Sequence, residues 1–163
     1  KENKRVLSLL VNNNAGVLSR ISGLFSRRGY NIDSLSVGVT ADPRYSRMTV
    51  VCTGEELILE QITKQLKKQV DIKVLDPEDS VCREMIMVKI STGAEQREGV
   101  AAIADIFRAK VVDVSKDSLV IELTGSKNKL EAFIELLEPY EILELARTGI
   151  VGLSRGAENV TFL

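Results

Sequence analysis

The chain of 163 residues has no histidine, no tryptophan and only two cysteines. Without histidine it cannot form a Ser-His-Asp triad, a Cys-His dyad or a metal site with histidine ligands. The sequence also contains no GxxxxGK(S/T) motif and no GxGxxG motif, which are common loops for binding nucleotide phosphates. Its carboxylates are mixed with lysines along stretches such as 55–69, a pattern typical of a solvated helix face. These absences argue against an enzyme.

The net charge and the lengths of the apolar runs argue against two classes of partner, nucleic acids and membranes. The net charge is −1 at pH 7, whereas a general nucleic-acid binder carries a basic excess, so nucleic acid is not expected as a partner. The apolar runs are far shorter than the roughly 20 residues of a membrane helix, so membrane association is not expected either. No signal peptide is visible, although the chain starts at Lys1 rather than Met and a removed leader would leave no trace.

The two cysteines indicate the redox compartment. Cys52 and Cys82 each lie in or beside an apolar run that is typical of a strand. Two such isolated cysteines do not make a disulfide framework, and cysteines in apolar runs are generally reduced core residues. We therefore predict two buried thiols and a cytoplasmic protein.

Two copies of one unit make up the chain. Residues 50–66 and 120–137 are similar, and each contains a Thr-Gly pair followed by an amphipathic helix. In the first copy, a helix is predicted from Val17 to Arg28 because its apolar residues fall on one face, and Gly29 is expected to end it. The predicted strands of this copy are 5–11, 31–39, 47–53 and 71–76.

The second copy repeats this order of elements. The apolar stripe of its first helix is predicted to be Val100, Ile103, Ile106 and Phe107. A two-residue turn, Lys116-Asp117, joins its middle strands, whereas the first copy has extra residues around 40–47. The predicted strands of this copy are 84–90, 110–115, 118–124 and 141–153.

The order βαββαβ builds an antiparallel four-stranded sheet with two helices on one face. We therefore predict an α+β protein with two ferredoxin-like βαββαβ domains in tandem, residues 1–76 and 77–163, with Pro77 in the linker 76–80. In each domain one sheet face and the sheet edges remain uncovered. The second copy or another chain should cover them.

The stretch NNNAGVLSR, residues 12–20, joins the first strand to the first helix. Unpaired N–H groups at a helix N-terminus suit a carboxylate, and a glycine lets the backbone approach a ligand closely. Asparagine side chains can accept a hydrogen bond from an ammonium group. With Asn31 and the apolar Ala15, Val17 and Ile32, the loop fits a free α-amino acid, although a turn capped by local hydrogen bonds is the simpler interpretation.

Longer stretches of the sequence resemble a known family. VLSLLVNNNAGVLSRISGLFSRRGYNIDSLSVG, with SRMTVV downstream, resembles the regulatory small subunit of acetolactate synthase, also called acetohydroxyacid synthase. In that family the first domain is an ACT domain, an amino-acid-sensing module. REMIMVKI, IFRAKVVDVS and ARTGIVGLSRG resemble the family's C-terminal domain. The resemblance covers essentially the whole chain and implies an N-terminal ACT domain followed by a C-terminal ACT-like domain.

The resemblance implies a regulatory subunit of branched-chain amino acid biosynthesis, with no catalytic site and no cofactor of its own. Such subunits bind the large catalytic subunit, raise its activity and confer feedback inhibition, commonly by valine. The large subunit condenses two pyruvates, or pyruvate and 2-oxobutyrate, using thiamine diphosphate, Mg²⁺ and FAD. The expected partners are therefore the large subunit, a free branched-chain amino acid and a second copy of the chain, bound as a homodimer through the ACT domains.

The family places its effector between the ACT domains of two chains. By position, the partner chain supplies Asn31 and Ile32. The first chain supplies the strand-to-helix loop, namely Asn13, Ala15, Gly16, Val17 and Leu18. Asn12 and Asn14 flank Asn13. Beside that Asn, relatives often carry an acidic or other polar residue, whereas this chain has Asn again. No metal ligand and no catalytic residue is expected.

Several alternatives stay open. An ACT-domain sensor that regulates another enzyme would have the same loop. An RNA-binding module has the same βαββαβ order but needs aromatic residues on its central strands, and MTVVCT and LVIELT have none. The segment 152–156 is either an ordered tail or a contact with the catalytic subunit. Four arginines are interpreted first as ordinary surface charge: Arg27, Arg28, Arg44 and Arg47.

Overall fold

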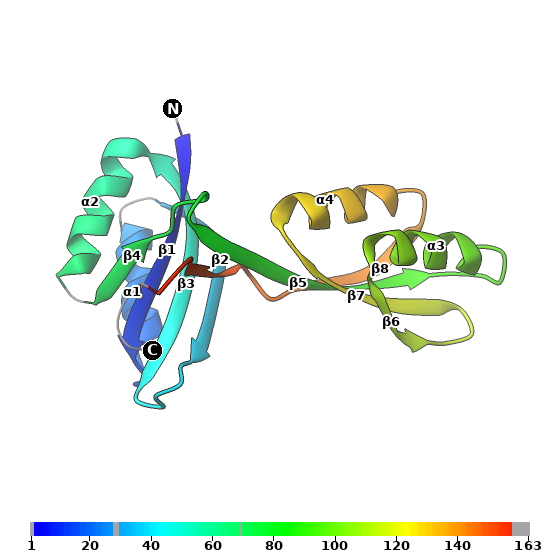
Figure 1. The fold of residues 1–163 in the computed structure, drawn as a ribbon, viewed down its shortest axis with the longest axis horizontal. Coiled ribbons are helices and arrows are strands. Elements are labelled where there is room, and N and C mark those ends of the chain that lie inside the picture. The colour runs from blue at the N-terminus through cyan, green and yellow to red at the C-terminus, as the bar shows by residue number, and fades with distance from the viewer. Residues whose placement is uncertain (1, 28–29, 69, 158–163) are drawn as a thin grey trace. The chain divides into compact units, whose positions relative to one another are not determined.

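Figure 1 shows the computed structural model, which describes residues 2–27, 30–68 and 70–157. Contacts divide the chain into two compact units. The first comprises Lys1–Cys82 together with Ile150–Leu163, and the second comprises Arg83–Gly149. The repeat predicted two contiguous domains, so the grouping of the C-terminal segment with the first unit is a difference that the repeat did not indicate.

In the first unit, four strands form one antiparallel sheet in the order β2-β3-β1-β4. The long central pair, β1 and β3, is in register from Glu2↔Glu55 to Asn12↔Tyr45. The predicted end of the first helix at Gly29 lies outside the described residues. The elements are β1 (Glu2–Asn12), α1 (Val17–Arg27), β2 (Asn31–Val39), β3 (Tyr45–Glu55), α2 (Glu56–Lys67) and β4 (Asp71–Val74).

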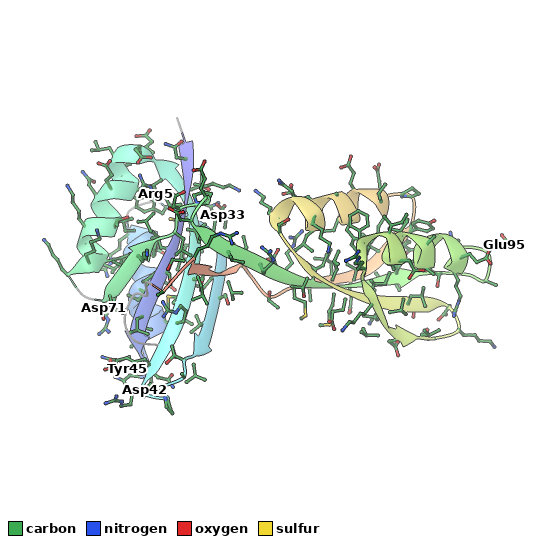
Figure 2. The ribbon with its side chains drawn as sticks, in the orientation of Figure 1. Arg5, Asp33, Asp42, Tyr45, Asp71 and Glu95 are labelled. Carbon is green, nitrogen blue, oxygen red and sulfur yellow. The ribbon has the colours of Figure 1, made fainter. Side chains whose placement is uncertain are left out.

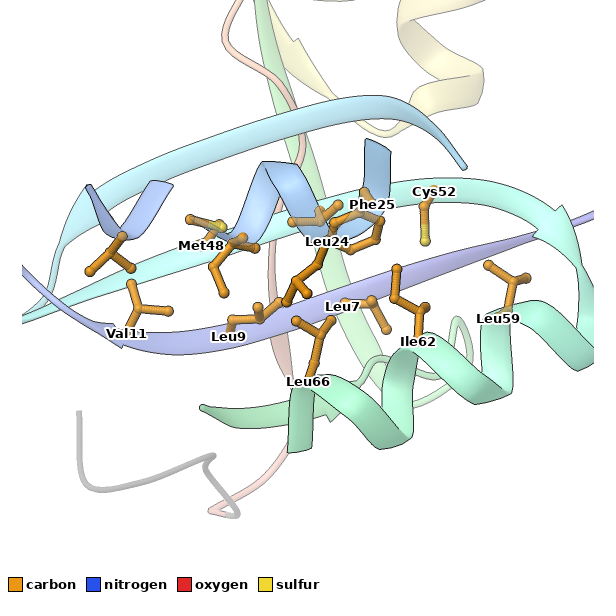
Figure 3. Packing of buried hydrophobic residues seen from close by; sticks show 13 residues of the cluster. Leu7, Leu9, Val11, Leu24, Phe25, Met48, Cys52, Leu59, Ile62 and Leu66 are labelled. Carbon is orange, nitrogen blue, oxygen red and sulfur yellow. The ribbon is translucent and has the colours of Figure 1, made fainter. Parts of the chain in front are cut away.

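The core of the first unit lies between its sheet and its two helices (Figure 3). Side chains alternate along a strand, so β1 directs Leu7, Leu9 and Val11 toward the helices. Burying each large apolar side chain contributes about 1.5–3 kcal/mol relative to leaving it exposed. The helices contribute residues with helical spacing: Val17, Ile21, Leu24 and Phe25 from α1, and Leu59, Ile62 and Leu66 from α2.

The opposite face of this sheet is also largely buried. Ser8 and Thr49 are each only 1% exposed on this face. The Ile150 amide donates a hydrogen bond of 2.8 Å to Ser34 Oγ, and Ser34 pairs with Val51 of β3. The segment that begins at Ile150 therefore crosses this face, so part of the cover that was expected from another domain or chain comes from the end of the same chain.

The predicted last strand, 141–153, consists of two strands. β8 (Glu141–Arg147) and β9 (Val151–Ser154) are separated at Gly149, which has a φ of 86°. β9 pairs with β5 (Ser80–Ser91), and Gly152 is buried there. A Cβ atom at Gly152 would lie 2.8 Å from Cys82 Sγ, so a larger residue does not fit without a shift. This close packing anchors β9 in the first unit.

The second unit repeats the architecture with the strand order β6-β7-β5-β8. Its elements are β5, α3 (Arg97–Phe107), β6 (Lys110–Val114), β7 (Ser118–Gly125), α4 (Lys127–Leu136) and β8. The predicted stripe of α3 is wrong at Ile106, whose side chain is 73% exposed. Ile106 lies six residues after the buried Val100, about a third of a turn away from the core direction, and Ala104 takes a buried position instead.

Candidate functional site

The loop after β1 is tied to the hairpin that joins β2 to β3. The Asn13 amide N–H donates to the Arg44 carbonyl oxygen at 2.8 Å, and Asn13 Nδ2 donates to the Pro43 carbonyl oxygen at 3.1 Å. The Val17 N–H also donates to the Asn14 carbonyl oxygen at 3.4 Å. The predicted turn with local hydrogen bonds is therefore present, and it holds the loop in place at the start of α1.

Gly16 gives this loop an open backbone surface. Its φ is +89°, in the region that favours glycine, and beyond Gly16 and its two chain neighbours no heavy atom lies within 4 Å of the position that a Cβ would occupy. Ala15 is exposed, and Leu18 is 45% exposed. Val17 is buried in the core, so only its backbone faces the loop. At the start of α1 the Val17 N–H is used by Asn14 and the Arg20 N–H donates to the Gly16 carbonyl oxygen at 3.0 Å. The N–H groups of Leu18 and Ser19 between them have no partner within the helix, so the loop is suited to a carboxylate.

Asn31 and Ile32 lie at the other end of the same sheet. Asn31 pairs with Thr53, whereas Asn12, which leads into the loop, pairs with Tyr45. Tyr45 and Thr53 are separated along β3 by about 26 Å, at roughly 3.3 Å per residue. Figure 2 shows this separation, with Tyr45 at one end of the sheet and Asp33 at the other. One chain therefore does not bring the two predicted halves of the site together.

Asp33 is a polar residue of this region that the sequence did not single out. It lies at a bulge in β2, where the register with β3 shifts between Ile32 and Ser34. Asn31 Nδ2 donates to Asp33 Oδ1 at 2.8 Å, and Thr53 Oγ1 donates to the other carboxylate oxygen. The sequence contained one signal, an Asn and an Asp two positions apart, but the contact with Thr53 depends on the strand register.

The hairpin between β2 and β3 carries a local ion pair. The Arg44 guanidinium hydrogen-bonds the Asp42 carboxylate and lowers its pKa to about 2. Arg44 and Arg27 are exposed, as predicted for surface charge, and Arg28 lies outside the described residues. Arg47 differs, because it is half-buried on the sheet face and donates to Ser8 Oγ at 2.8 Å. Burial lowers the pKa of Arg47.

The two cysteines are reduced thiols with different environments. Cys52 is buried as predicted, whereas the prediction is wrong for Cys82, which is half-buried beside Ser80 at a distance of 3.9 Å between Oγ and Sγ. Burial, and secondarily the Asp33 carboxylate, raises the pKa of the Cys52 thiol to about 11.

We expect Cys52 to resist alkylation in the folded protein at pH 8. Only the thiolate reacts, and a raised pKa together with burial leaves very little of it. Iodoacetamide labelling followed by peptide mass spectrometry should show Cys82 modified well before Cys52, and equal labelling after denaturation serves as the control. Faster labelling of Cys52 than of Cys82 would contradict the burial of this strand.

Neither a metal centre nor a membrane segment emerges from the described part of the chain. Within residues 2–27, 30–68 and 70–157, no three His, Cys, Asp or Glu side chains are grouped so that they could hold a metal ion. None of the helices in these ranges is long and apolar enough to cross a membrane.

Family models match both halves of the chain. Residues 7–73 match a model described as the AHAS small subunit-like ACT domain, which contains the loop after β1 and the bulge in β2. Residues 83–156 match a model described as the small subunit of acetolactate synthase. Residues 7–73 of the first unit therefore form an ACT domain, and the predicted class of two ferredoxin-like domains is confirmed.

Relatives cover nearly the whole chain. The acetolactate synthase small subunit of Mycolicibacterium smegmatis is 50% identical over 94% of this chain and 92% of its own length. That of Bacillus subtilis is 48% identical over 95% of this chain and 92% of its own. The crystal structure of the acetolactate synthase small subunit from Thermotoga maritima superposes with a TM-score of 0.87 at 38% identity, covering 96% of this chain and 99% of that one.

The chain therefore belongs to the acetolactate synthase small-subunit family, as its sequence suggested. It is a regulatory subunit, and a small subunit of this kind associates with the large subunit of acetolactate synthase.

Proposed function

We propose that this subunit binds a free branched-chain amino acid, commonly valine, between the ACT domains of two copies and thereby inhibits the large subunit. The observation that supports the proposal is the division of the candidate site. Its loop and its Asn31 lie at opposite ends of one sheet, so each copy offers two half-sites. A twofold-symmetric dimer is the simplest assembly that joins a loop to the Asn31 of another chain.

The edge strand β2 supplies the surface for such a dimer. Val37 and Val39 are 46% and 62% exposed on this edge, and unpaired edge strands readily add another strand. In an antiparallel pair of two β2 strands, the Asn31 end of one lies beside the Val39 end of the other. Val39 pairs with Ser46, next to Tyr45, so the partner's Asn31 arrives at the end of the sheet where the loop lies.

The chemistry of the two half-sites complements that of an α-amino acid. The start of α1 and the open backbone at Gly16 suit the effector carboxylate. The amide of Asn31 from the partner suits the ammonium group. The exposed apolar side chains of Ala15 and Leu18, with the half-buried Ile32 of the partner, suit a small aliphatic side chain. Asn13 fixes the loop through its bonds to the β2–β3 hairpin.

The chemical reaction itself belongs, in this proposal, to the large subunit, which carries the thiamine diphosphate, Mg²⁺ and FAD. This chain contributes no catalytic residue and no cofactor. It raises the activity of its partner, and the effector opposes this by binding one arrangement of the complex better than another. Such couplings are generally about 1–3 kcal/mol, or 5–150-fold in affinity. The cytoplasmic location stays a prediction from the cysteine content.

We expect calorimetric titration with valine to show saturable binding near one site per chain. Leucine, isoleucine and threonine serve as comparators, and Asn13→Ala should weaken binding because the loop loses its tie to Pro43. A chain that binds none of these amino acids, alone or with the large subunit added, would overturn the proposal. Binding only after addition of the large subunit would place the completed site in the holoenzyme.

The second candidate is an ACT-domain sensor that regulates another enzyme, since the same half-sites would serve it. Co-purification distinguishes the two, because only the first candidate copurifies with, and activates, a thiamine-diphosphate enzyme.

A further inference from the structure

A hydrogen bond to Asp33 orients the side-chain amide of Asn31. Its amide presents one donor atom and one acceptor atom, and an asparagine can in general turn either toward a ligand. Here one side of the amide faces the Asp33 carboxylate at 2.8 Å. An ionised carboxylate only accepts hydrogen bonds, so the amide atom that faces it is the nitrogen. The oxygen of Asn31 is therefore directed away from Asp33 and can accept only from another group.

Asp33 is itself held by a second donor. Thr53 Oγ1 donates to the carboxylate oxygen that Asn31 does not use. Thr53 belongs to β3, the neighbouring strand, and the bulge at Asp33 allows the two side chains to meet. Thr53 and Asn31 thus both donate to the Asp33 carboxylate. The amide oxygen of Asn31 is left to accept a hydrogen bond from a ligand.

We propose that Asp33 makes the effector site selective for an α-amino acid over the 2-hydroxy or 2-oxo acid of the same carbon skeleton. This inference rests on the proposed function, in which Asn31 meets the effector. The oxygen of Asn31 accepts from an ammonium group, and the nearby negative charge favours a cation. A 2-oxo acid has no donor there, and a hydroxyl donates only a neutral hydrogen bond, which is weaker.

The same residues orient the effector. The Asp33 charge repels the effector carboxylate, which therefore lies against the first turn of α1 and the open backbone at Gly16. The effector ammonium group therefore lies at the Asn31 half-site, and its carboxylate lies at the loop half-site. Such selectivity is useful to a regulator of an enzyme whose substrates are 2-oxo acids, because the regulator has to bind the amino acid without binding these substrates.

The test compares valine with 2-hydroxy-3-methylbutanoate and 3-methyl-2-oxobutanoate. Dissociation constants are measured by calorimetry for the full chain together with the large subunit. We expect Asp33→Ala to weaken valine binding by about tenfold or more and to leave the hydroxy acid nearly unchanged, so that the preference for the amino acid shrinks. Thr53→Val removes only the outer hydroxyl and should reduce the preference by a smaller factor in the same direction.

Asp113→Ala provides the matched control, because Asp113 is an exposed aspartate beside the bulge of β6 in the second unit. It should leave the affinities for all three compounds unchanged. Equal weakening of all three compounds in Asp33→Ala would assign Asp33 a purely structural role and overturn the inference. An unchanged preference would also overturn it. In both cases the proposed function still stands if the wild-type complex binds valine. If the wild-type complex binds none of the three compounds, the proposed function is overturned as well.

Discussion

Replacement of Gly16 by aspartate is expected to abolish valine binding, with a loss of affinity of about 100-fold or more. The new carboxylate would stand where the effector carboxylate approaches the start of α1, and like charges in contact cost several kcal/mol. The space next to Gly16 is open, so the side chain enters it without displacing other atoms. Titration calorimetry with valine measures the loss, and in the complex valine should no longer inhibit the large subunit.

Backbone strain has to be separated from charge in this experiment. A non-glycine residue at a φ of +89° is strained by about 1–2 kcal/mol whatever its side chain. Gly156→Asp is the matched control, because Gly156 also has a positive φ, +77°, and open space around it. This control should bind valine like the wild type. If Gly16→Asp also keeps full valine sensitivity, the loop is not the effector site.

The elements of the fold were predictable because their signals are local. Alternating apolar residues mark β1, and an apolar stripe marks α1, so both were predicted within a few residues of their observed bounds. The end of the chain was not predictable in the same way. The run from Glu141 to Leu153 has the composition of one strand, but the break at Gly149 and the pairing of β9 with β5 depend on residues far away in the sequence.

The loop of the candidate site could be singled out for a different reason. The loop is contiguous, so its glycine and asparagines were recognisable from composition and from the family resemblance. The sequence did not single out Asp33 because its contacts depend on a bulge, which becomes visible only from the pairing of β2 with β3. Val17 illustrates the opposite case. It was selected for the site as an apolar neighbour of Gly16, but its side chain belongs to the core, and it can contribute to the site only through its backbone.

Two glutamates on the β2 edge, Val37→Glu with Val39→Glu, are expected to convert the proposed dimer to a monomer and to remove valine binding at the same time. Both side chains are exposed within one chain, so the fold should tolerate the change. Across an antiparallel β2 pair with Asn31 beside Val39, the glutamate at position 37 of one copy lies opposite Asp33 of the other, and like charges opposite each other destabilise strand pairing. Sedimentation equilibrium measures the mass, and calorimetry measures valine binding.

The second unit offers a matched control for this variant. Val111 and Val114 lie on β6, the edge strand that corresponds to β2 in the repeat, and are 41% and 60% exposed. Val111→Glu with Val114→Glu adds the same charge to an equivalent edge and should leave both the dimer and the affinity for valine unchanged. A monomeric β2 variant that still binds valine would show that one chain contains the whole site. A β2 variant that stays dimeric and binds valine normally would show that the dimer interface lies away from this edge. Because the loop and Asn31 are far apart in one chain, another surface would then have to bring the loop of one copy to the Asn31 of the other.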